Sequence, residues 1–409
     1  MEQQCIENTV SQTIGEDIYN RLIAEFEKNI VKNTRQKKTV YCFAPYAGWN
    51  NQQLVKNCGA LPLVFFRHYG FRAVMVGGQV GEYPYLDTYL KGIQMDILQD
   101  TSVEAKVQYV EEHAREMDLV VLHGFFREYI PMMDKYKELN PNGKIYMETD
   151  VNSYSQDRED WNDEAFRRLL GLCDVVGVSS RRMQRLLSRK WPCVIEYLPN
   201  GFYNFAGVNM EVDFSKKENL ILTVGRIGTA QKANEILLEA FAMVADSIPG
   251  WSLQLTGSIT DNFKEYFKKY MMRFPELEGR VILTGIISDK QQLMDQYKKA
   301  KVFALTSIAE GGAPNVVAEA LNSGCTMVCS EFDAVDDVIG ERTCGRSFPI
   351  MDVNALSKIL LEVCLDEDYL KKTGLNALHY GRSKLDFEKI MDRLYYLLYG
   401  NEAQYGTNH

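Results

Sequence analysis

The most constraining feature of the sequence is an alternation of short apolar, β-branched segments with helical segments. In the first half, strands are predicted at 39–45, 72–78, 118–124, 143–149, 174–180 and 193–201, with helical stretches at 59–70 and 102–117. Strands separated by helices form parallel βαβ units. A parallel sheet has to be covered on both faces, which explains the near-continuous apolar character of these strands.

The alternation restarts after a polar link near 208–219. Strands are predicted at 219–226, 251–258, 280–286, 301–307 and 326–330, with helices at 230–248, 289–300 and 314–324. A chain of 409 residues has room for two domains of ordinary size. We therefore expect two Rossmann-like α/β domains, 1–205 and 216–385, that face each other across a cleft.

The two ends of the chain are predicted to be helical. Residues 1–38 read as an amphipathic helix followed by a basic stretch, KNTRQKK. Residues 386–400 form an amphipathic helix whose aromatic stripe needs an apolar partner surface. We expect the C-terminal segment 386–409 to pack back on the first domain.

Composition excludes several classes of function. The formal net charge of −9 argues against a nucleic-acid partner. The nine cysteines are scattered, lack CxxC spacing and are interpreted as reduced thiols, which favours the cytosol. The N-terminus is polar and acidic, unlike a signal peptide, and no apolar run approaches the ~20 residues of a membrane span. A cytoplasmic protein is expected.

Ligands of open α/β sheets bind at the carboxyl ends of the strands. At one such end, the segment LTVGRIGTAQK places Gly225 and Arg226 after a strand and Lys232 just before a helix. The glycine allows close backbone approach, and the two cations could neutralise a diphosphate. The alternative is an exposed loop with two incidental cations.

A second strand end carries the segment TSIAEGGAPNVVAEALNSG. Glu310 is followed by Gly311 and Gly312, and a helix begins at Pro314 or Asn315. A helix N-terminus behind a glycine loop is a site for anions. Glu319, in the second turn, could accept hydrogen bonds from sugar hydroxyls. The alternative is that both glutamates are solvated surface acids.

The two segments LTVGRIGTAQK and TSIAEGGAPNVVAEALNSG occur in an order and at a spacing typical of a known family. Residues 219–400, which contain them, resemble the family 4 retaining glycosyltransferases of the GT-B fold. The resemblance implies that Arg226 and Lys232 bind the donor diphosphate and that Glu319 holds the ribose hydroxyls. It places Glu310 near the transferred sugar. It further implies contacts to the donor from Gly225, Ile286, Ile287, Gly311, Gly312, Asn315 and Val316, with the two isoleucines beside the base.

The sequence departs from the family pattern at one point. The family has seven residues between the two glutamates, whereas eight separate Glu310 from Glu319. The flanking residues match on both sides, so the extra residue is placed in the GGAPN turn. This insertion bears on the role of Glu310 and on the identity of the sugar.

The N-terminal half resembles the family in architecture alone, as expected if it binds a variable acceptor. Gly48 stands where the family has a glycine-rich loop near the donor phosphates. His123 ends one predicted strand, at a position where relatives often have a sugar-contacting histidine, and a structural role is the alternative. Asp150 follows another predicted strand, and both residues are catalytic candidates. His68 and His113 lie in helical stretches and are interpreted as structural.

The resemblance implies a retaining hexosyltransferase that takes a nucleotide-diphosphate sugar, with UDP as the nucleotide, and a glycan or lipid-linked acceptor. Such enzymes use positioning and charge stabilisation. No metal and no cofactor are expected, because no DxD at a strand end and no His/Cys cluster with metal spacing is present. The alternatives are a non-catalytic GT-B partner subunit, a nucleotide-sugar 2-epimerase and a sugar-polymer synthase.

The basic segment Arg181–Trp191 also has two interpretations. A basic amphipathic helix can lie on an anionic membrane, which would suit a lipid-linked acceptor. More often the apolar side of such a helix packs on its own sheet, and we favour that interpretation.

Overall fold

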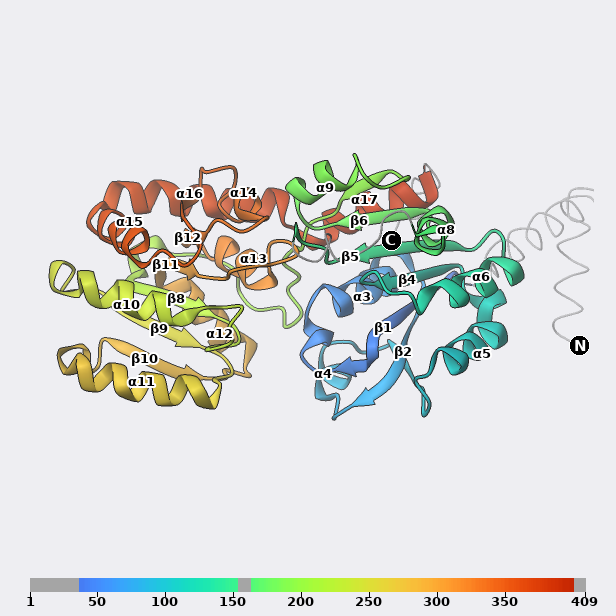
Figure 1. The fold of residues 1–409 in the computed structure, drawn as a ribbon, viewed down its shortest axis with the longest axis horizontal. Coiled ribbons are helices and arrows are strands. Elements are labelled where there is room, and N and C mark those ends of the chain that lie inside the picture. The colour runs from blue at the N-terminus through green and yellow to red at the C-terminus, as the bar shows by residue number, and fades with distance from the viewer. Residues whose placement is uncertain (1–36, 154–162, 401–409) are drawn as a thin grey trace, which may run out of the picture. The chain divides into compact units, whose positions relative to one another are not determined.

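The computed structural model describes residues 37–153 and 163–400. Contacts divide the chain into two units, Met1–Lys38 and Thr39–His409, and the second is described here. The helix predicted near the N-terminus lies outside the described residues. The second unit holds two parallel sheets, which Figure 1 shows with their helices.

The first sheet has seven parallel strands in the order β3-β2-β1-β4-β5-β6-β7. The strands are β1 (Thr39–Asn50), β2 (Arg72–Val80), β3 (Gln94–Ile97), β4 (Leu119–His123), β5 (Lys144–Thr149), β6 (Val175–Val178) and β7 (Ile195–Tyr197). The six predicted strands are confirmed. Edge strand β3 was not predicted, because its sequence QMDI is half-polar and none of its residues is fully buried.

Helices cover both faces of this sheet. One face packs against α3 (Asn57–Tyr69) and α17 (Phe387–Tyr399). The other packs against α5 (Val103–His113), α6 (Tyr129–Leu139), α8 (Glu164–Leu172) and α9 (Arg181–Leu187). Alternate residues of β1 enter the two cores, Val40 and Cys42 one and Tyr41 and Phe43 the other.

The second sheet has six parallel strands in the order β10-β9-β8-β11-β12-β13. The strands are β8 (Glu218–Val224), β9 (Ser252–Thr256), β10 (Val281–Gly285), β11 (Ala300–Leu305), β12 (Thr326–Ser330) and β13 (Gly345–Phe348). Five are confirmed predictions. Strand β13 was not predicted, because GRSF lacks an apolar run.

The helices of this half also form two layers. One contains α10 (Asn234–Val244), α11 (Asp261–Arg273) and α15 (Val353–Leu365). The other contains α12 (Lys290–Lys299), α13 (Asn315–Asn322), α14 (Val335–Val338) and α16 (Glu367–Lys384). Short helix α4 (Pro84–Thr88) belongs to the first half. Each half thus has a parallel sheet with helices on both faces, which is the expected α/β architecture.

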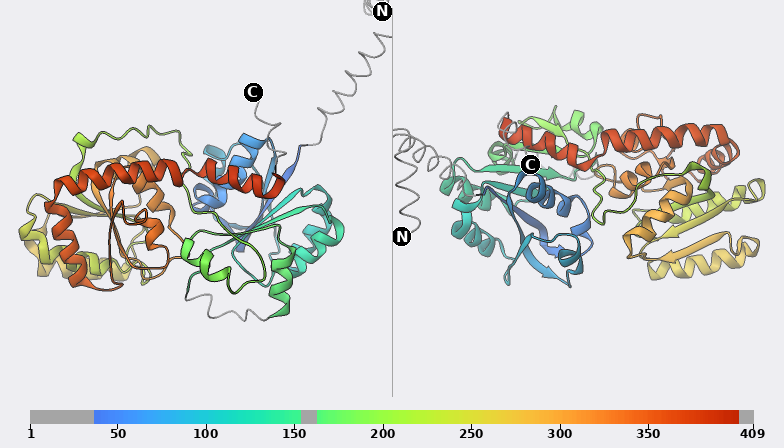
Figure 2. Two further views of the ribbon diagram at one scale, coloured as in Figure 1. Left: turned by 90° about the horizontal axis from the view of Figure 1, so that it is seen from above. Right: turned by 180° about the vertical axis from the view of Figure 1, so that it is seen from behind.

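The last helix returns to the first sheet. Figure 2 shows α16 and α17 in succession along the molecule. A bridge between Phe202 and Asp386 precedes α17, and the helix then buries Ile390, Leu394 and Leu398 in the core that contains α3. Tyr395 stacks on Tyr69 with ring centroids 4.2 Å apart. The apolar surface that the C-terminal stripe requires is therefore α3 and its surroundings.

Helix α9 buries its apolar side. Met183 and Leu187 are buried in the core of the first sheet, and so is Trp191 beyond the helix. The packing interpretation therefore accounts for the amphipathic pattern of 181–191. Among the described helices, none is both long enough and apolar enough to cross a membrane.

Two aspartates of the second half bind polar groups of the first. Asp337 is 2% exposed and accepts hydrogen bonds from the Tyr197 hydroxyl (2.8 Å) and the Arg181 backbone amide (3.1 Å). Asp333 accepts from the Ser153 amide at 2.7 Å. A buried carboxylate needs such partners, so these contacts fix how the segment around α14 meets β7 and α9.

Tyr197→Phe should lower the free energy of unfolding by about 1–2 kcal/mol, because it removes a hydrogen bond to a buried carboxylate while keeping the ring. Urea denaturation measures the change. Tyr396→Phe is the control, because Tyr396 is 57% exposed on α17. Equal stability of the two variants would show that the Tyr197 hydroxyl contributes nothing.

Candidate functional site

The strand ends of the two sheets surround one cavity of about 330 Å³. The first sheet supplies residues that end β4 and β5 or follow β5 and β6, and the second supplies the loop after β11. The lining includes Lys56, Asn57, Cys58, His123, Glu148, Asp150, Ser179, Asn200, Glu310, Gly311, Gly312 and Asn315. The structure thus brings His123, Asp150 and Glu310 into one cavity, as Rossmann-like halves would.

Lys232 and Glu310 form an ion pair in which both side chains are largely buried. Gln231 donates to Glu310 Oε2 at 3.2 Å and accepts from Arg226 Nη2 at 2.7 Å. The aliphatic part of Lys232 passes Gly225, where an added Cβ would lie 4.0 Å from Lys232 Cε. Arg226, Lys232 and Glu310 therefore form one connected polar group, with the Arg226 guanidinium exposed.

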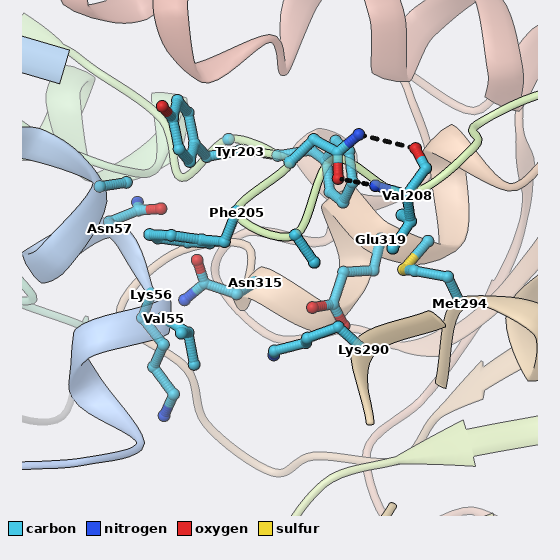
Figure 3. Close-up of a pocket in the computed structure, with 15 residues that line it drawn as sticks. Val55, Lys56, Asn57, Tyr203, Phe205, Val208, Lys290, Met294, Asn315 and Glu319 are labelled. Carbon is cyan, nitrogen blue, oxygen red and sulfur yellow. Dashed lines mark hydrogen bonds between the residues drawn. The ribbon is translucent and has the colours of Figure 1, made fainter. Parts of the chain in front are cut away.

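Glu319 lines a second, smaller cavity of about 30 Å³ with Lys290, Phe205 and Asn315 (Figure 3). The Tyr297 hydroxyl donates to Glu319 Oε2 at 2.7 Å. That bond holds the carboxylate where it lines the cavity. Asn315 lines both cavities, so Glu319 and Glu310 belong to adjoining spaces.

The glycines of the GGAPN turn lie against the first sheet. A Cβ on Gly311 would fall 1.9 Å from Asp150 Oδ1, and one on Gly312 would fall 1.9 Å from Ser179 Oγ. Neither distance leaves room for a side chain. The GGAPN turn, where the sequence analysis places the extra residue, therefore contacts the strand ends of the other half.

Asn200 connects the two halves at the cavity wall. Its side-chain amide donates to the Ala313 carbonyl at 2.8 Å, and its oxygen accepts from Asn57 at the start of α3. Asn57 is buried. This chain of hydrogen bonds holds the beginning of α3 next to the turn before α13.

His123 lies at the end of β4 and is 5% exposed. Its Nδ1 lies 2.8 Å from Glu148 Oε2, and its Nε2 has no hydrogen-bond partner among the described residues. Trp49 packs edge-on against the imidazole, with centroids 5.4 Å apart. Burial lowers the pKa of His123, but the neighbouring Cys58, Cys42 and Glu148 outweigh it and hold that pKa well above its usual range.

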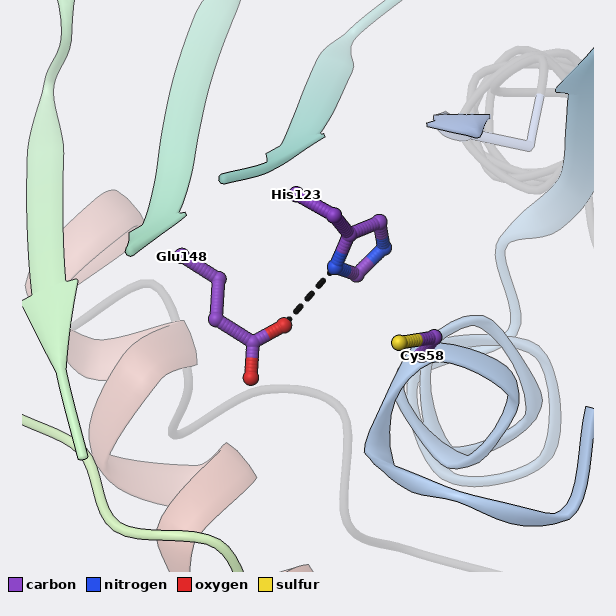
Figure 4. A group of neighbouring side chains, drawn as sticks. All are labelled: Cys58, His123 and Glu148. Atoms are coloured by element: carbon purple, nitrogen blue, oxygen red, sulfur yellow. Dashed lines mark hydrogen bonds and ion pairs between the residues drawn. The ribbon is translucent and has the colours of Figure 1, made fainter. Parts of the chain in front are cut away.

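Cys58, His123 and Glu148 form the group drawn in Figure 4, with their potential ligand atoms within 4.8 Å of one another. Sequence spacing gave no sign of it, because the three residues come from α3, β4 and β5. Glu148 already binds Nδ1 of the histidine. The absence of a metal stays a prediction for this site.

Asp150 follows β5, and its solvent-exposed side chain lines the cavity. Desolvation by the cavity walls, together with the nearby Glu148 and Glu310 carboxylates, raises the pKa of Asp150 to about 6, although Lys232 and Lys56 act in the opposite direction. A carboxyl group with this pKa changes its charge close to physiological pH.

Four predicted donor-site residues line neither cavity and do not belong to the polar group of Arg226, Lys232 and Glu310. Gly48 pairs with Gly78 between β1 and β2, and a Cβ there would fall 2.0 Å from the Gly78 carbonyl oxygen. Close strand approach therefore explains this glycine, which is not among the lining residues of either cavity. Ile286 is 64% exposed beyond β10, with Ile287 beside it, and Val316 is half-buried in the first turn of α13.

Sequence reasoning missed Glu148, Lys56, Asn200 and the position of Cys58. Glu148 had a signal, because it is a lone carboxylate that follows the apolar centre of its strand, near the carboxyl end. Lys56, Asn57 and Cys58 precede or begin a helix, and without the sheet order their distance from β4 could not be foreseen. Asn200 stands in an ordinary polar turn.

Comparisons with known proteins agree with this geometry. Residues 218–366 match the family model of glycosyl transferases group 1. A phosphatidyl-myo-inositol mannosyltransferase from Mycolicibacterium smegmatis is 22% identical over 177 residues, which are 42% of this chain and 44% of the relative. The chain thus aligns with less than half the length of that curated relative.

Solved structures share the whole fold. Sucrose-phosphate synthase from Thermosynechococcus elongatus has a TM-score of 0.67 at 18% identity, over 89% of this chain and 100% of that one. Anabaena HepE, solved with UDP and glucose, has 0.65 at 16% identity, over 87% and 98%. A glycosyltransferase from Rickettsia africae has 0.69 at 15% identity, over 90% and 100%. The expected GT-B fold is confirmed.

Asp150→Asn should stabilise the protein above pH 6. The native state holds the Asp150 proton more tightly than the unfolded chain, so ionisation destabilises the fold as pH rises toward and past about 6. The amide removes this effect and should gain at most about 1–2 kcal/mol near pH 7.5, since water in the cavity screens the charge. Urea denaturation near pH 7.5 and pH 4 measures it. A variant less stable than wild type near pH 7.5 would contradict the assignment.

Gly312→Ala should destabilise the protein by about 1–3 kcal/mol, because the new methyl group meets the side chain and backbone of Ser179. Gly171→Ala is the matched control. Gly171 lies in α8 with no atom within 4 Å of the added Cβ, so alanine should preserve or slightly raise stability. Thermal unfolding compares the pair, and an unchanged melting temperature for Gly312→Ala would show that the turn can move away from β6.

Proposed function

We propose that the protein is a retaining, metal-independent glycosyltransferase that moves a hexose from a nucleotide-diphosphate sugar, with UDP as the nucleotide, to an acceptor hydroxyl. The observation that carries the proposal is the linked polar group Arg226–Gln231–Glu310–Lys232 at the cavity where both sheets end. The group 1 domain over 218–366 and the UDP and UDP-glucose complexes of HepE support it.

The donor diphosphate is proposed to bind Arg226 and Lys232. Lys232 is paired with Glu310 in the structure, and a diphosphate would compete for its ammonium group. The exposed guanidinium of Arg226 can form bidentate hydrogen bonds to phosphate oxygens. The amides of Gly311, Gly312, Asn315 and Val316, before and within the first turn of α13, would add donors at a helix N-terminus.

The nucleoside is proposed to lie along α13 toward β10. Glu319 would accept hydrogen bonds from the ribose hydroxyls, with Tyr297 holding the carboxylate in place. Ile286 and Ile287 would provide an apolar contact for the base. Ile286 is 64% exposed, so its side chain is accessible to a base.

Transfer is proposed to take place beside His123, Asp150 and Glu310. The bond from the anomeric carbon to the phosphate oxygen breaks, and the acceptor oxygen forms the new bond on the same face. The acceptor proton passes to the leaving diphosphate. The protein then contributes orientation and charge stabilisation: cations on the diphosphate and carboxylates around the sugar ring.

The acceptor is proposed to be a glycan or a lipid-linked molecule. The name of the mycolicibacterial relative, a phosphatidyl-myo-inositol mannosyltransferase, supports a lipid. Peripheral membrane contact through Arg181–Trp191 would use exposed basic side chains such as Arg185, Arg189 and Lys190, because the apolar side chains Met183, Leu187 and Trp191 are buried. A non-catalytic partner subunit is less well supported, because Arg226, Lys232 and Glu319 are all present.

UDP and UDP-sugars should raise the melting temperature of the purified protein, and Arg226→Ala should weaken UDP binding about 10- to 100-fold by removing a charge-assisted contact. A thermal-shift titration with UDP, GDP and ADP sugars measures both effects. Arg226 is exposed, so its removal should leave the fold intact.

Lys269→Ala on α11 is the matched control, since it removes an exposed cation of the same half away from both cavities. It should bind UDP as wild type does. A shift that survives in Arg226→Ala would overturn the diphosphate assignment, and the absence of a shift with every nucleotide would favour the non-catalytic partner.

A further inference from the structure

Cys58 is placed unlike the other described cysteines. It lies in the first turn of α3, a 13-residue helix, and it lines the cavity where the two sheets end. It is half-buried, whereas Cys42, Cys325, Cys329, Cys344 and Cys364 are buried. The positive end of a helix dipole stabilises a thiolate in the first turn.

The imidazole beside Cys58 gives a second, independent reason for reactivity. His123 is 5% exposed, and its Nε2 has no hydrogen-bond partner among the described residues although it lies within the same cavity wall. Glu148 binds the opposite nitrogen at 2.8 Å (Figure 4). This carboxylate fixes the ring and favours the imidazolium, as in sites where a cysteine is activated by an oriented histidine.

We propose that Cys58 is a covalent modification site: a cavity-lining thiol beside the His123 imidazole, which Glu148 orients, that forms mixed disulfides with small disulfide compounds. The thiolate sulfur attacks one sulfur of the disulfide, a new S–S bond forms, and the other half leaves as a thiolate that takes up a proton from solvent. Added dithiol reverses the reaction. No metal or further oxidant is required.

The modification has a consequence for the cavity. A group attached to Cys58 would share the space that Asp150, Glu310 and Asn315 line. If the proposed glycosyltransferase function holds, the adduct would block transfer while leaving Arg226, which is not among the lining residues, free to contact UDP. Modification of the thiol itself does not depend on that function.

Cys193 and Cys173 provide internal controls, since they too are half-buried. Burial raises the pKa of Cys193 to about 11. Burial also raises the pKa of Cys173, whose thiol donates to the Leu169 carbonyl at 3.3 Å. Neither thiol should react readily at neutral pH.

The test is time-resolved labelling of the intact protein near pH 7, first with iodoacetamide and then with oxidised glutathione, followed by peptide mass spectrometry. Iodoacetamide forms an S–C bond and releases iodide, so it reports thiolate reactivity without redox chemistry. Cys58 should be labelled at least about 10-fold faster than Cys193. Glu148→Gln and His123→Gln should each remove most of that difference, while folding is monitored by circular dichroism.

Equal labelling of Cys58 and Cys193 would overturn the proposal, and so would fast labelling that both variants retain. Stoichiometric Zn²⁺ binding by wild type but not by Cys58→Ser, together with slow alkylation of the metal-free protein, would identify the group as a metal site instead. Glutathione labelling of Cys58 would stand even if UDP failed to bind, so the two proposals fail separately.

Discussion

The site depends on one close approach: the backbone of Gly311 and Gly312 lies against the strand ends of the first sheet with no space for a Cβ atom. This approach carries Glu310, the residue before the turn, to within electrostatic reach of Asp150. It also sets the start of α13 beside Asn200. A bulkier turn would separate the carboxylates that share the cavity and open the cavity itself.

The cavity is therefore a place where charges must compensate each other. Glu148, Asp150 and Glu310 bring three carboxylates into a small volume, with Lys232, Lys56 and His123 opposite them. The three carboxylates differ in how their charge is compensated. Glu310 pairs with Lys232 and Glu148 pairs with His123, whereas the pKa of Asp150 is raised. Lys232 and His123 are thus committed to internal partners, and a bound anion has to compete for them.

Much of the fold follows from the sequence, because the apolar β-branched runs of a parallel sheet are distinctive. Strands β3 and β13 escaped detection because edge strands such as QMDI and GRSF do not need two buried faces.

The site could be predicted only in part. Arg226, Lys232 and Glu310 could be grouped in advance, because each follows the end of a predicted strand. The trio of Cys58, His123 and Glu148 could not, because it depends on strand order and on the start of α3. Gly48 was predicted to lie near the donor phosphates. In the structure, its close packing against Gly78 is a sufficient reason for a glycine at this position, without any ligand.

The return of α17 to the first sheet has a consequence for how the protein is made. Phe387, Ile390 and Leu394 of α17 complete a core whose other members, outside α17, lie between Val40 and Leu198, far earlier in the chain. During synthesis the apolar surface of α3 thus stays uncovered while the whole second half emerges from the ribosome. The first half is the earlier one to be translated and the later one to be finished, so the nascent chain carries an open hydrophobic face for most of its elongation.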